Sequence, residues 1–152
     1  MQKLTPFFWM HGQAEQACQF YTSLFDDASY TVEMPGPDGG AFIVSFTLQG
    51  QKYVFMNSTD VYTLSPAFSL QIDCVNQAEV DRIWEAMMDG GTPMACGWIT
   101  DRFGLTWQVI PRQFFELLNS GTPAQSMAVM TAMQTMIKFD VSGLQAAFDG
   151  AI

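Results

Sequence analysis

The chain has 152 residues, of which 49% are hydrophobic and 14% are charged. Its 15 acidic residues outnumber its 6 Lys and Arg residues and give a net charge of −9. This charge argues against binding to nucleic-acid phosphates or to an anionic membrane surface, because both functions need clustered basic side chains. The basic residues form no run along the sequence, so we expect neither a nucleic-acid partner nor a membrane partner.

Targeting segments and disulfide bonds are not expected. The first residues hold no apolar stretch of signal-peptide length, and no run reaches the ~20 apolar residues of a membrane span. Three cysteines (Cys18, Cys74 and Cys96) form no Cys-x-x-Cys pair. They are typical of reduced thiols, and we therefore expect a cytoplasmic protein.

Large apolar side chains are abundant, with 13 Phe, 4 Trp and 11 Met. One small core needs fewer, so the composition predicts an apolar pocket, a subunit interface or both. We expect a homodimer, in which a second copy would cover part of this apolar surface.

A helical pattern of apolar residues occurs twice, and each copy follows a strand-like run. The second copy starts 63 positions after the first, and both hold the spacing i, i+3, i+4, i+7: Ala17, Phe20, Tyr21 and Leu24, then Val80, Ile83, Trp84 and Met87. This repeat predicts an α+β fold of two tandem βαβββ modules, whose sheets can leave a lined cleft between them.

The first module is expected to begin with a buried strand over 4–10 and a helix over 14–25. Its remaining strands are expected around 30–34, 42–48 and 53–57. Every second residue of the strand at 42–48 is a large apolar one, which is the period of a β-strand, and Gln49-Gly50 is a plausible hairpin turn after it.

The second module is expected to begin with a strand over 67–73. Asn76 and Glu79 have the spacing of a capping box, which predicts a helix that ends near Asp89, before Gly90-Gly91. A closing hairpin is expected over 93–99 and 104–110.

The last segment belongs to neither repeat. A short helical cluster follows Pro111, a second helix is expected over 124–138 with four methionines on one face, and a last turn over 144–148. We therefore predict one domain over residues 1–152, with a first module, a second module and C-terminal helices over 4–60, 65–111 and 112–152.

A known family resembles this chain over nearly its whole length. The resemblance rests on Thr5 to Trp9, on the helix end Phe20-Tyr21, and on residues 96–111, Cys-Gly-Trp-Ile-Thr-Asp-Arg-Phe-Gly-Leu-Thr-Trp-Gln-Val-Ile-Pro. These segments closely resemble the PhnB-like branch of the glyoxalase/bleomycin-resistance superfamily, also called vicinal oxygen chelate. The resemblance implies paired modules that form a cupped mixed sheet, usually in a homodimer.

Members of this branch often carry the label 3-demethylubiquinone-9 3-methyltransferase. Methyltransferases that use S-adenosylmethionine usually place a glycine-rich turn between a first strand and a helix. Here His11-Gly12-Gln13 follows the first strand and holds no Gly-x-Gly, so the label is not supported by the residues.

Superfamily enzymes hold a divalent metal with His, Gln or Glu at four positions, two from each module. The resemblance places these positions near Pro6, at Met56 or Asn57, near Ser69 and at Gln108. Proline has no side-chain donor and serine is a poor neutral ligand, so Gln108 fits the pattern and Asn57 is a weak second. We therefore expect no catalytic metal and no cofactor.

Neutral polar side chains on the strands indicate a small-molecule pocket. In the second module we expect Ser69, Gln71, Thr106 and Gln108 to lie on the face opposite the helix. In the first module Ser45, Thr47, Tyr53 and Asn57 are the expected counterparts. Trp9 and Trp98 are candidate walls. The predicted ligand-binding residues are Gln108, Asn57, Ser69, Gln71, Thr106, Tyr53, Trp9 and Trp98.

Other polar residues have simpler interpretations. His11, the only histidine, ends a strand and is expected to be a solvated loop residue rather than a ligand or base. Cys96 has no histidine near it in the sequence and is expected to be structural. Asp101 and Arg102 are expected to form a solvated turn.

Three functions are compatible with the sequence. The leading hypothesis is a protein that binds a small neutral molecule in the cup, without a catalytic metal. The alternative is a metal-dependent lyase, isomerase or dioxygenase that uses Gln108, Asn57 and His11. A further alternative is a dimeric interaction module with a vestigial pocket.

Overall fold

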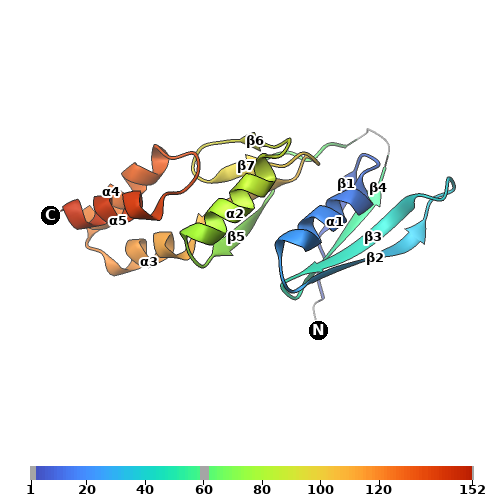
Figure 1. The fold of residues 1–152 in the computed structure, drawn as a ribbon, viewed down its shortest axis with the longest axis horizontal. Coiled ribbons are helices and arrows are strands. Elements are labelled where there is room, and N and C mark those ends of the chain that lie inside the picture. The colour runs from blue at the N-terminus through green and yellow to red at the C-terminus, as the bar shows by residue number, and fades with distance from the viewer. Residues whose placement is uncertain (1–2, 59–61, 152) are drawn as a thin grey trace. The chain divides into compact units, whose positions relative to one another are not determined.

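The computed structural model describes residues 3–58 and 62–151 (Figure 1). The chain separates into two compact units, Met1–Leu64 and Ser65–Ile152. Each unit contains a four-stranded mixed sheet and one helix that follows the first strand. This arrangement confirms the predicted α+β fold with two βαβββ modules and a helical C-terminal extension.

The first unit runs through five elements: β1 (Phe7–Met10), α1 (Ala14–Leu24), β2 (Ala28–Pro35), β3 (Ala41–Leu48) and β4 (Gln51–Asn57). Its strands lie in the order β1-β4-β3-β2, and β1 runs parallel to β4 while the other pairs are antiparallel. Gln49 and Gly50 both have positive φ angles of 50° and 79°, as a tight hairpin turn requires.

The second unit repeats this order with β5 (Ser69–Cys74), α2 (Gln77–Met88), β6 (Thr92–Pro93), β7 (Trp98–Thr100) and β8 (Thr106–Pro111). Its strands lie in the order β5-β8-β7-β6, again with one parallel pair, β5 and β8. The extension adds α3 (Arg112–Ser120), α4 (Pro123–Gln134) and α5 (Val141–Gly150).

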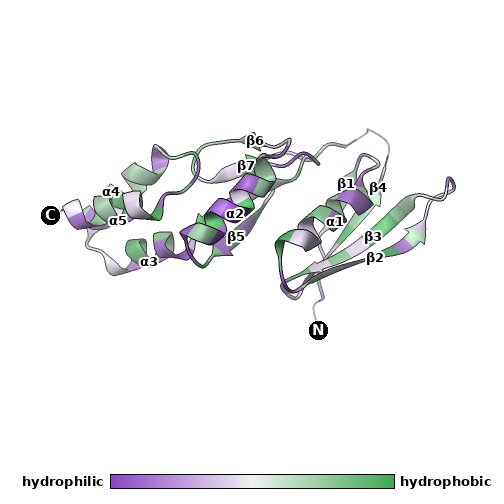
Figure 2. Cartoon of the chain, in the orientation of Figure 1, coloured by the Kyte–Doolittle hydropathy of each residue, from purple (hydrophilic) through white to green (hydrophobic). Residues whose placement is uncertain are grey.

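One face of each sheet holds the core of its unit. In the first unit α1 packs Tyr21 against β3 and β4, where the rings of Phe46 and Phe55 lie 4.5 Å apart between centroids. All three side chains are fully buried, and Figure 2 shows the hydrophobic residues along β3. In the second unit α2 buries its apolar repeat residues Val80, Ile83, Trp84 and Met87.

The predicted cap of α2 is confirmed. The Asn76 side chain accepts a hydrogen bond from the Glu79 amide at 3.0 Å, and the Glu79 carboxylate accepts one from the Val75 amide at 2.7 Å. Asn76 therefore satisfies a backbone donor that the helix leaves unpaired, while Glu79 bonds the amide of the residue before the cap and not that of Asn76.

The predicted boundaries of two elements in the second unit, a helix and a strand, were wrong. The helix expected over 124–138 ends at Gln134, so Met136 lies outside α4. The first strand of the closing hairpin divides into β6 and β7, because Cys96 and Gly97 between them have φ angles of 61° and 77°. Left-handed residues cannot continue a strand.

Asp101 is not the solvated turn residue that the sequence suggested. It is 4% exposed, and its carboxylate accepts hydrogen bonds from the Phe103 amide at 2.8 Å and the Leu105 amide at 3.1 Å. It also accepts one from the Trp107 indole at 2.8 Å. The buried carboxylate therefore holds the β7–β8 turn closed and fixes the Trp107 ring.

No helix in the described parts of the chain has the length and apolar character needed to cross a membrane.

Replacing Asp101 with alanine should strongly destabilise the second unit. The substitution leaves buried amide and indole donors without their acceptor, and we expect a loss of about 3 kcal/mol in unfolding free energy. Asp89→Ala is the matched control, because Asp89 is 83% exposed in its 3.0 Å ion pair with Arg102. Urea unfolding should give the control a loss below about 1 kcal/mol; equal losses in both variants would contradict the assigned role of Asp101.

Candidate functional site

The face of the second sheet opposite α2 carries polar side chains in two rows. The strand register aligns four hydroxyl residues across the sheet, Ser69, Thr106, Thr100 and Thr92. The next row aligns two amides and an indole, Gln71, Gln108 and Trp98. Partners in register share a face, so five predicted ligand-binding residues lie together here.

A hydrogen bond joins two of these residues. Gln108 Nε2 donates to Ser69 Oγ at 2.8 Å, from β8 to the parallel strand β5. The bond fixes the orientation of the amide, because it uses the N–H side and leaves Oε1 as an acceptor on the other side. Both side chains are half-buried, and Gln71 beside them is exposed.

Thr106 has a different position from its neighbours. It is 1% exposed, and its hydroxyl shares a hydrogen bond of 2.9 Å with the Thr100 hydroxyl. Thr106 therefore ties β8 to β7 beneath the surface of this face.

The register of the first sheet corrects the predicted face of Tyr53 and Asn57. Ser45 pairs with Val54, and Phe46 pairs with Tyr53, so Tyr53 and Asn57 lie on the face that α1 covers. The Tyr53 ring stacks on Phe46 with centroids 5.0 Å apart, and burial raises the pKa of its phenol. Ser45 and Thr47 lie on the opposite face.

Asn57 holds the start of α1 in place. Its Oδ1 accepts a hydrogen bond from the Ala14 amide at 2.9 Å, and its Nδ2 donates to the Ala41 carbonyl at 2.8 Å. Gln13, the residue before the helix, makes no side-chain cap. Asn57 therefore supplies the cap from β4 and links the helix to the start of β3.

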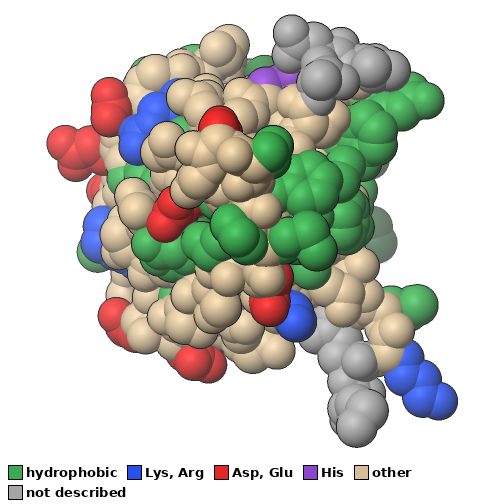
Figure 3. All heavy atoms as spheres, turned by 90° about the vertical axis from the view of Figure 1, so that its right-hand side faces the viewer, with side chains coloured by type: hydrophobic (Ala, Val, Ile, Leu, Met, Phe, Trp, Pro, Cys, Tyr) green, Lys and Arg blue, Asp and Glu red, His purple; other side chains and the backbone are tan. Residues whose placement is uncertain are grey.

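The opposite face of the first sheet is mainly apolar. One row crosses it from β1 to β2 and consists of Trp9, Met56, Ile43 and Met34. Phe7 and Met34 are 53% and 51% exposed. Figure 3 views the molecule from the side of β2 and β3 and shows hydrophobic side chains gathered there.

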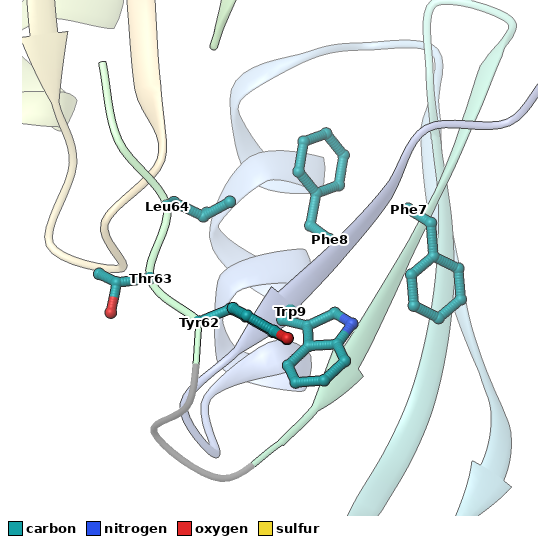
Figure 4. A pocket seen from close by; sticks show the side chains of 6 residues that line it. All are labelled: Phe7, Phe8, Trp9, Tyr62, Thr63 and Leu64. Carbon is teal, nitrogen blue, oxygen red and sulfur yellow. The ribbon is translucent and has the colours of Figure 1, made fainter. Parts of the chain in front are cut away.

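A shallow pocket of about 170 Å³ lies along the edge strand β1 (Figure 4). Trp9 and Tyr62 meet edge to face in its wall, with centroids 4.9 Å apart. The other lining residues are Phe7, Phe8, Thr63 and Leu64. The pocket is aromatic, and Trp9 is the only predicted ligand-binding residue among those that line it.

A larger pocket of about 460 Å³ lies where α1 begins, beside the loop between β2 and β3. Asn57, Glu15 and Asp38 line it together with glycines of the loop. The Asp38 carboxylate accepts a hydrogen bond from the Gly40 amide at 3.2 Å, so it shapes the loop itself.

The donors at the four superfamily positions do not fit a divalent metal. Asn57 Oδ1 accepts the Ala14 amide on the helix side of its sheet, and Met56 is the residue of β4 on the other face. Gln108 bonds Ser69 through its N–H group and keeps Oε1 open, but one amide oxygen is too few donors for a firm divalent-metal site. Among the described residues no three His, Cys, Asp or Glu side chains gather as a metal site.

The thiols show two kinds of environment. Cys18 and Cys74 are fully buried, and burial raises the pKa of each thiol to about 12, so neither supplies a thiolate near neutral pH. Cys96 is half-buried, and its amide donates to the Met136 carbonyl at 2.8 Å. This contact belongs to the Cys96 backbone and does not involve the thiol. His11 is exposed after β1.

Asp101 and Thr100 support the site and were not predicted as parts of it. Asp101 fixes Trp107, which lies directly before Gln108 in β8, and Thr100 bonds Thr106. The Thr100-Asp101 pair stands in the sequence as an ordinary turn, so no local signal marks either role.

Comparisons with known proteins agree with this fold. Residues 2–110 match the family described as 3-demethylubiquinone-9 3-methyltransferase. A PhnB protein from Bacillus cereus is 32% identical, with a TM-score of 0.63 over 70% of this chain and 97% of that chain. A protein from Pseudomonas aeruginosa is 16% identical, with a TM-score of 0.58 over 70% and 95% of the two chains. No curated protein sequence matches the chain.

Replacing Asn57 with alanine should lower the stability of the first unit by about 2 kcal/mol, since it removes the cap of α1 and the bond to β3. Asn57→Asp keeps the acceptor for Ala14 and should lose about half as much. Thermal and urea unfolding measure both effects, with exposed Asn119→Ala as the control. An unchanged stability in Asn57→Ala would show that the cap does not matter to the fold.

Proposed function

Because the chain belongs to the 3-demethylubiquinone-9 3-methyltransferase (PhnB-like) family, we propose that it binds a small neutral molecule on the polar face of its second sheet. The observation that carries this proposal is the hydrogen bond of 2.8 Å between Gln108 and Ser69. It holds a half-buried amide in one orientation on a face where four hydroxyls and a second amide are aligned.

The chemistry of this face favours a neutral ligand with a hydrogen-bond donor. Gln108 Oε1 is an acceptor, and the Ser69 hydroxyl keeps a proton to donate. Neither group carries a charge, so a neutral ligand loses little solvation when it replaces water here. The net charge of −9 disfavours anions over the whole surface.

Trp98 completes the face with an apolar surface. It stands opposite Gln108 in the register and is half-buried, so an indole and an amide are adjacent on neighbouring strands. A flat or apolar part of a ligand would pack on the indole while its polar part reaches the amide.

The metal-dependent and methyl-transfer alternatives receive less support. Pro6 has no side-chain donor, Ser69 is a poor neutral ligand and Asn57 Oδ1 accepts the Ala14 amide, so Gln108 Oε1 is the single suitable oxygen at the superfamily positions. Each sheet has a single parallel strand pair, unlike the doubly wound parallel sheets that bind nucleotide cofactors at their switch points.

A homodimer is a second proposal, and the apolar row on the first sheet favours it. Met34 of this row and the nearby first-unit residues Phe7 and Tyr62 are each more than half exposed, and a second copy would cover such side chains. In an isologous dimer the same row would serve both copies.

The binding proposal predicts ligand-dependent stabilisation that needs Gln108. A thermal-shift screen of neutral, cationic and anionic small molecules should give its hits among neutral compounds, and a hit at about 100 times its Kd stabilises by about 2.7 kcal/mol. The shift should be lost in Gln108→Ala and retained in Gln145→Ala, whose exposed amide bonds Asp149 in α5. Hits that survive Gln108→Ala would remove Gln108 from the site, and a screen with only anionic hits would contradict the proposal.

A further inference from the structure

The segment between α4 and α5 connects the extension to the second sheet. We name residues 136–141 the anchor segment. The Cys96 amide donates to the Met136 carbonyl and the Gly97 amide donates to the Ile137 carbonyl, both at 2.8 Å. The anchor segment therefore binds the backbone directly before β7, where two successive residues adopt left-handed conformations.

This backbone needs the anchor segment to hold its shape. Cys96 has a φ angle of 61°, a left-handed conformation that is strained for a residue with a side chain. At Gly97 a Cβ atom would lie 2.5 Å from the Phe139 ring and 2.9 Å from the Val109 carbonyl oxygen. Phe139 is 1% exposed, so its ring is packed against a position that only glycine can occupy.

A second set of contacts fixes the other end of the anchor segment to α2. Gln77 Nε2 donates to the Phe139 carbonyl at 2.9 Å, and Gln77 Oε1 accepts the Val141 amide at 2.7 Å. Lys138 forms an ion pair of 2.6 Å with Asp81, which also accepts from Gln77. The Gln77 side chain therefore bonds the backbone on both sides of Asp140, at Phe139 and at Val141.

The connection continues from the anchor segment into the candidate binding face. The Gly97 carbonyl accepts a hydrogen bond from the Val109 amide at 2.8 Å, so Gly97 joins the anchor segment to β8. The next residue in the chain is Trp98, which lies opposite Gln108 in the register.

We propose that the anchor segment positions Trp98 beside Gln108, so that the C-terminal extension shapes the binding face from outside it. This inference rests on the proposed function, since Trp98 and Gln108 belong to the proposed site. The extension lies beyond residues 2–110, which match the family, and the Bacillus cereus relative is covered over 97% of its length by 70% of this chain. The anchor segment therefore lies outside the part of the chain that matches the family model.

The test uses the full chain and needs no ligand. Gln77→Met removes the bonds to Phe139 and Val141 with little change in volume, and Gln145→Met is the matched control on the exposed side of α5. Amide hydrogen exchange measures the release of Cys96 and Gly97. The ¹⁵N–¹H indole signal of Trp98, identified with Trp98→Phe, measures its position, with Trp9 of the first unit as internal reference.

We expect Gln77→Met to raise exchange at Cys96 and Gly97 roughly tenfold or more, since weakened docking opens these hydrogen bonds. The Trp98 indole signal should move or broaden while that of Trp9 stays, and Gln145→Met should change neither. Faster exchange with an unmoved Trp98 signal would overturn the inference. If Gln77→Met does not fold, Lys138→Met, which removes the ion pair with Asp81, is judged by the same two signals.

The two proposals can fail separately. A moved Trp98 signal supports positioning whatever the thermal-shift screen finds. An unmoved signal overturns positioning even where Gln108-dependent hits are found.

Discussion

The structure depends on one constraint, which is that a single helix can cover only one face of a four-stranded sheet. In each unit the helix that follows the first strand buries the apolar side chains of that face, such as Phe55 under α1 and Val109 under α2. The other face of each sheet is then free to take side chains for a different purpose. Alternation along the strands separates the two sets residue by residue.

The two opposite faces differ in chemistry although the modules repeat in topology. The first carries an apolar row that runs from Trp9 to Met34, and the second carries the hydroxyl row and the Gln108 amide. The fold therefore keeps one architecture and varies the surface that it presents. Buried polar groups, Asp101 and Thr106, support the polar face from within by fixing the hairpin of β7 and β8.

Much of this could be predicted from the sequence. The repeat of apolar residues located both helices, and alternation in β5 and β8 placed Ser69 and Gln108 on one face. The prediction of which side chains face the helix was wrong in β4. Val54 and Met56 are as apolar as Phe55, so the sequence of this strand does not distinguish its buried face from its other face. Asn57 and Asp101 owe their roles to hydrogen bonds with Ala14 and Trp107. The spacing of residues along the sequence does not predict these hydrogen bonds. Likewise, α4 ends at Gln134, and the Met136 and Ile137 carbonyls beyond it accept the Cys96 and Gly97 amides, which are far away in the sequence.

Our main proposal is that Gln108 binds a neutral ligand and not a metal ion. Elemental analysis of tag-free protein purified without a chelator, before and after soaking with Ni²⁺, Zn²⁺, Mn²⁺ and Fe²⁺, tests it most directly. We expect far less than one bound metal ion per chain and no difference in metal content between the native protein and Gln108→Ala. About one ion per chain that is lost in Gln108→Ala would show that Gln108 is a metal ligand and would favour metal-dependent catalysis instead.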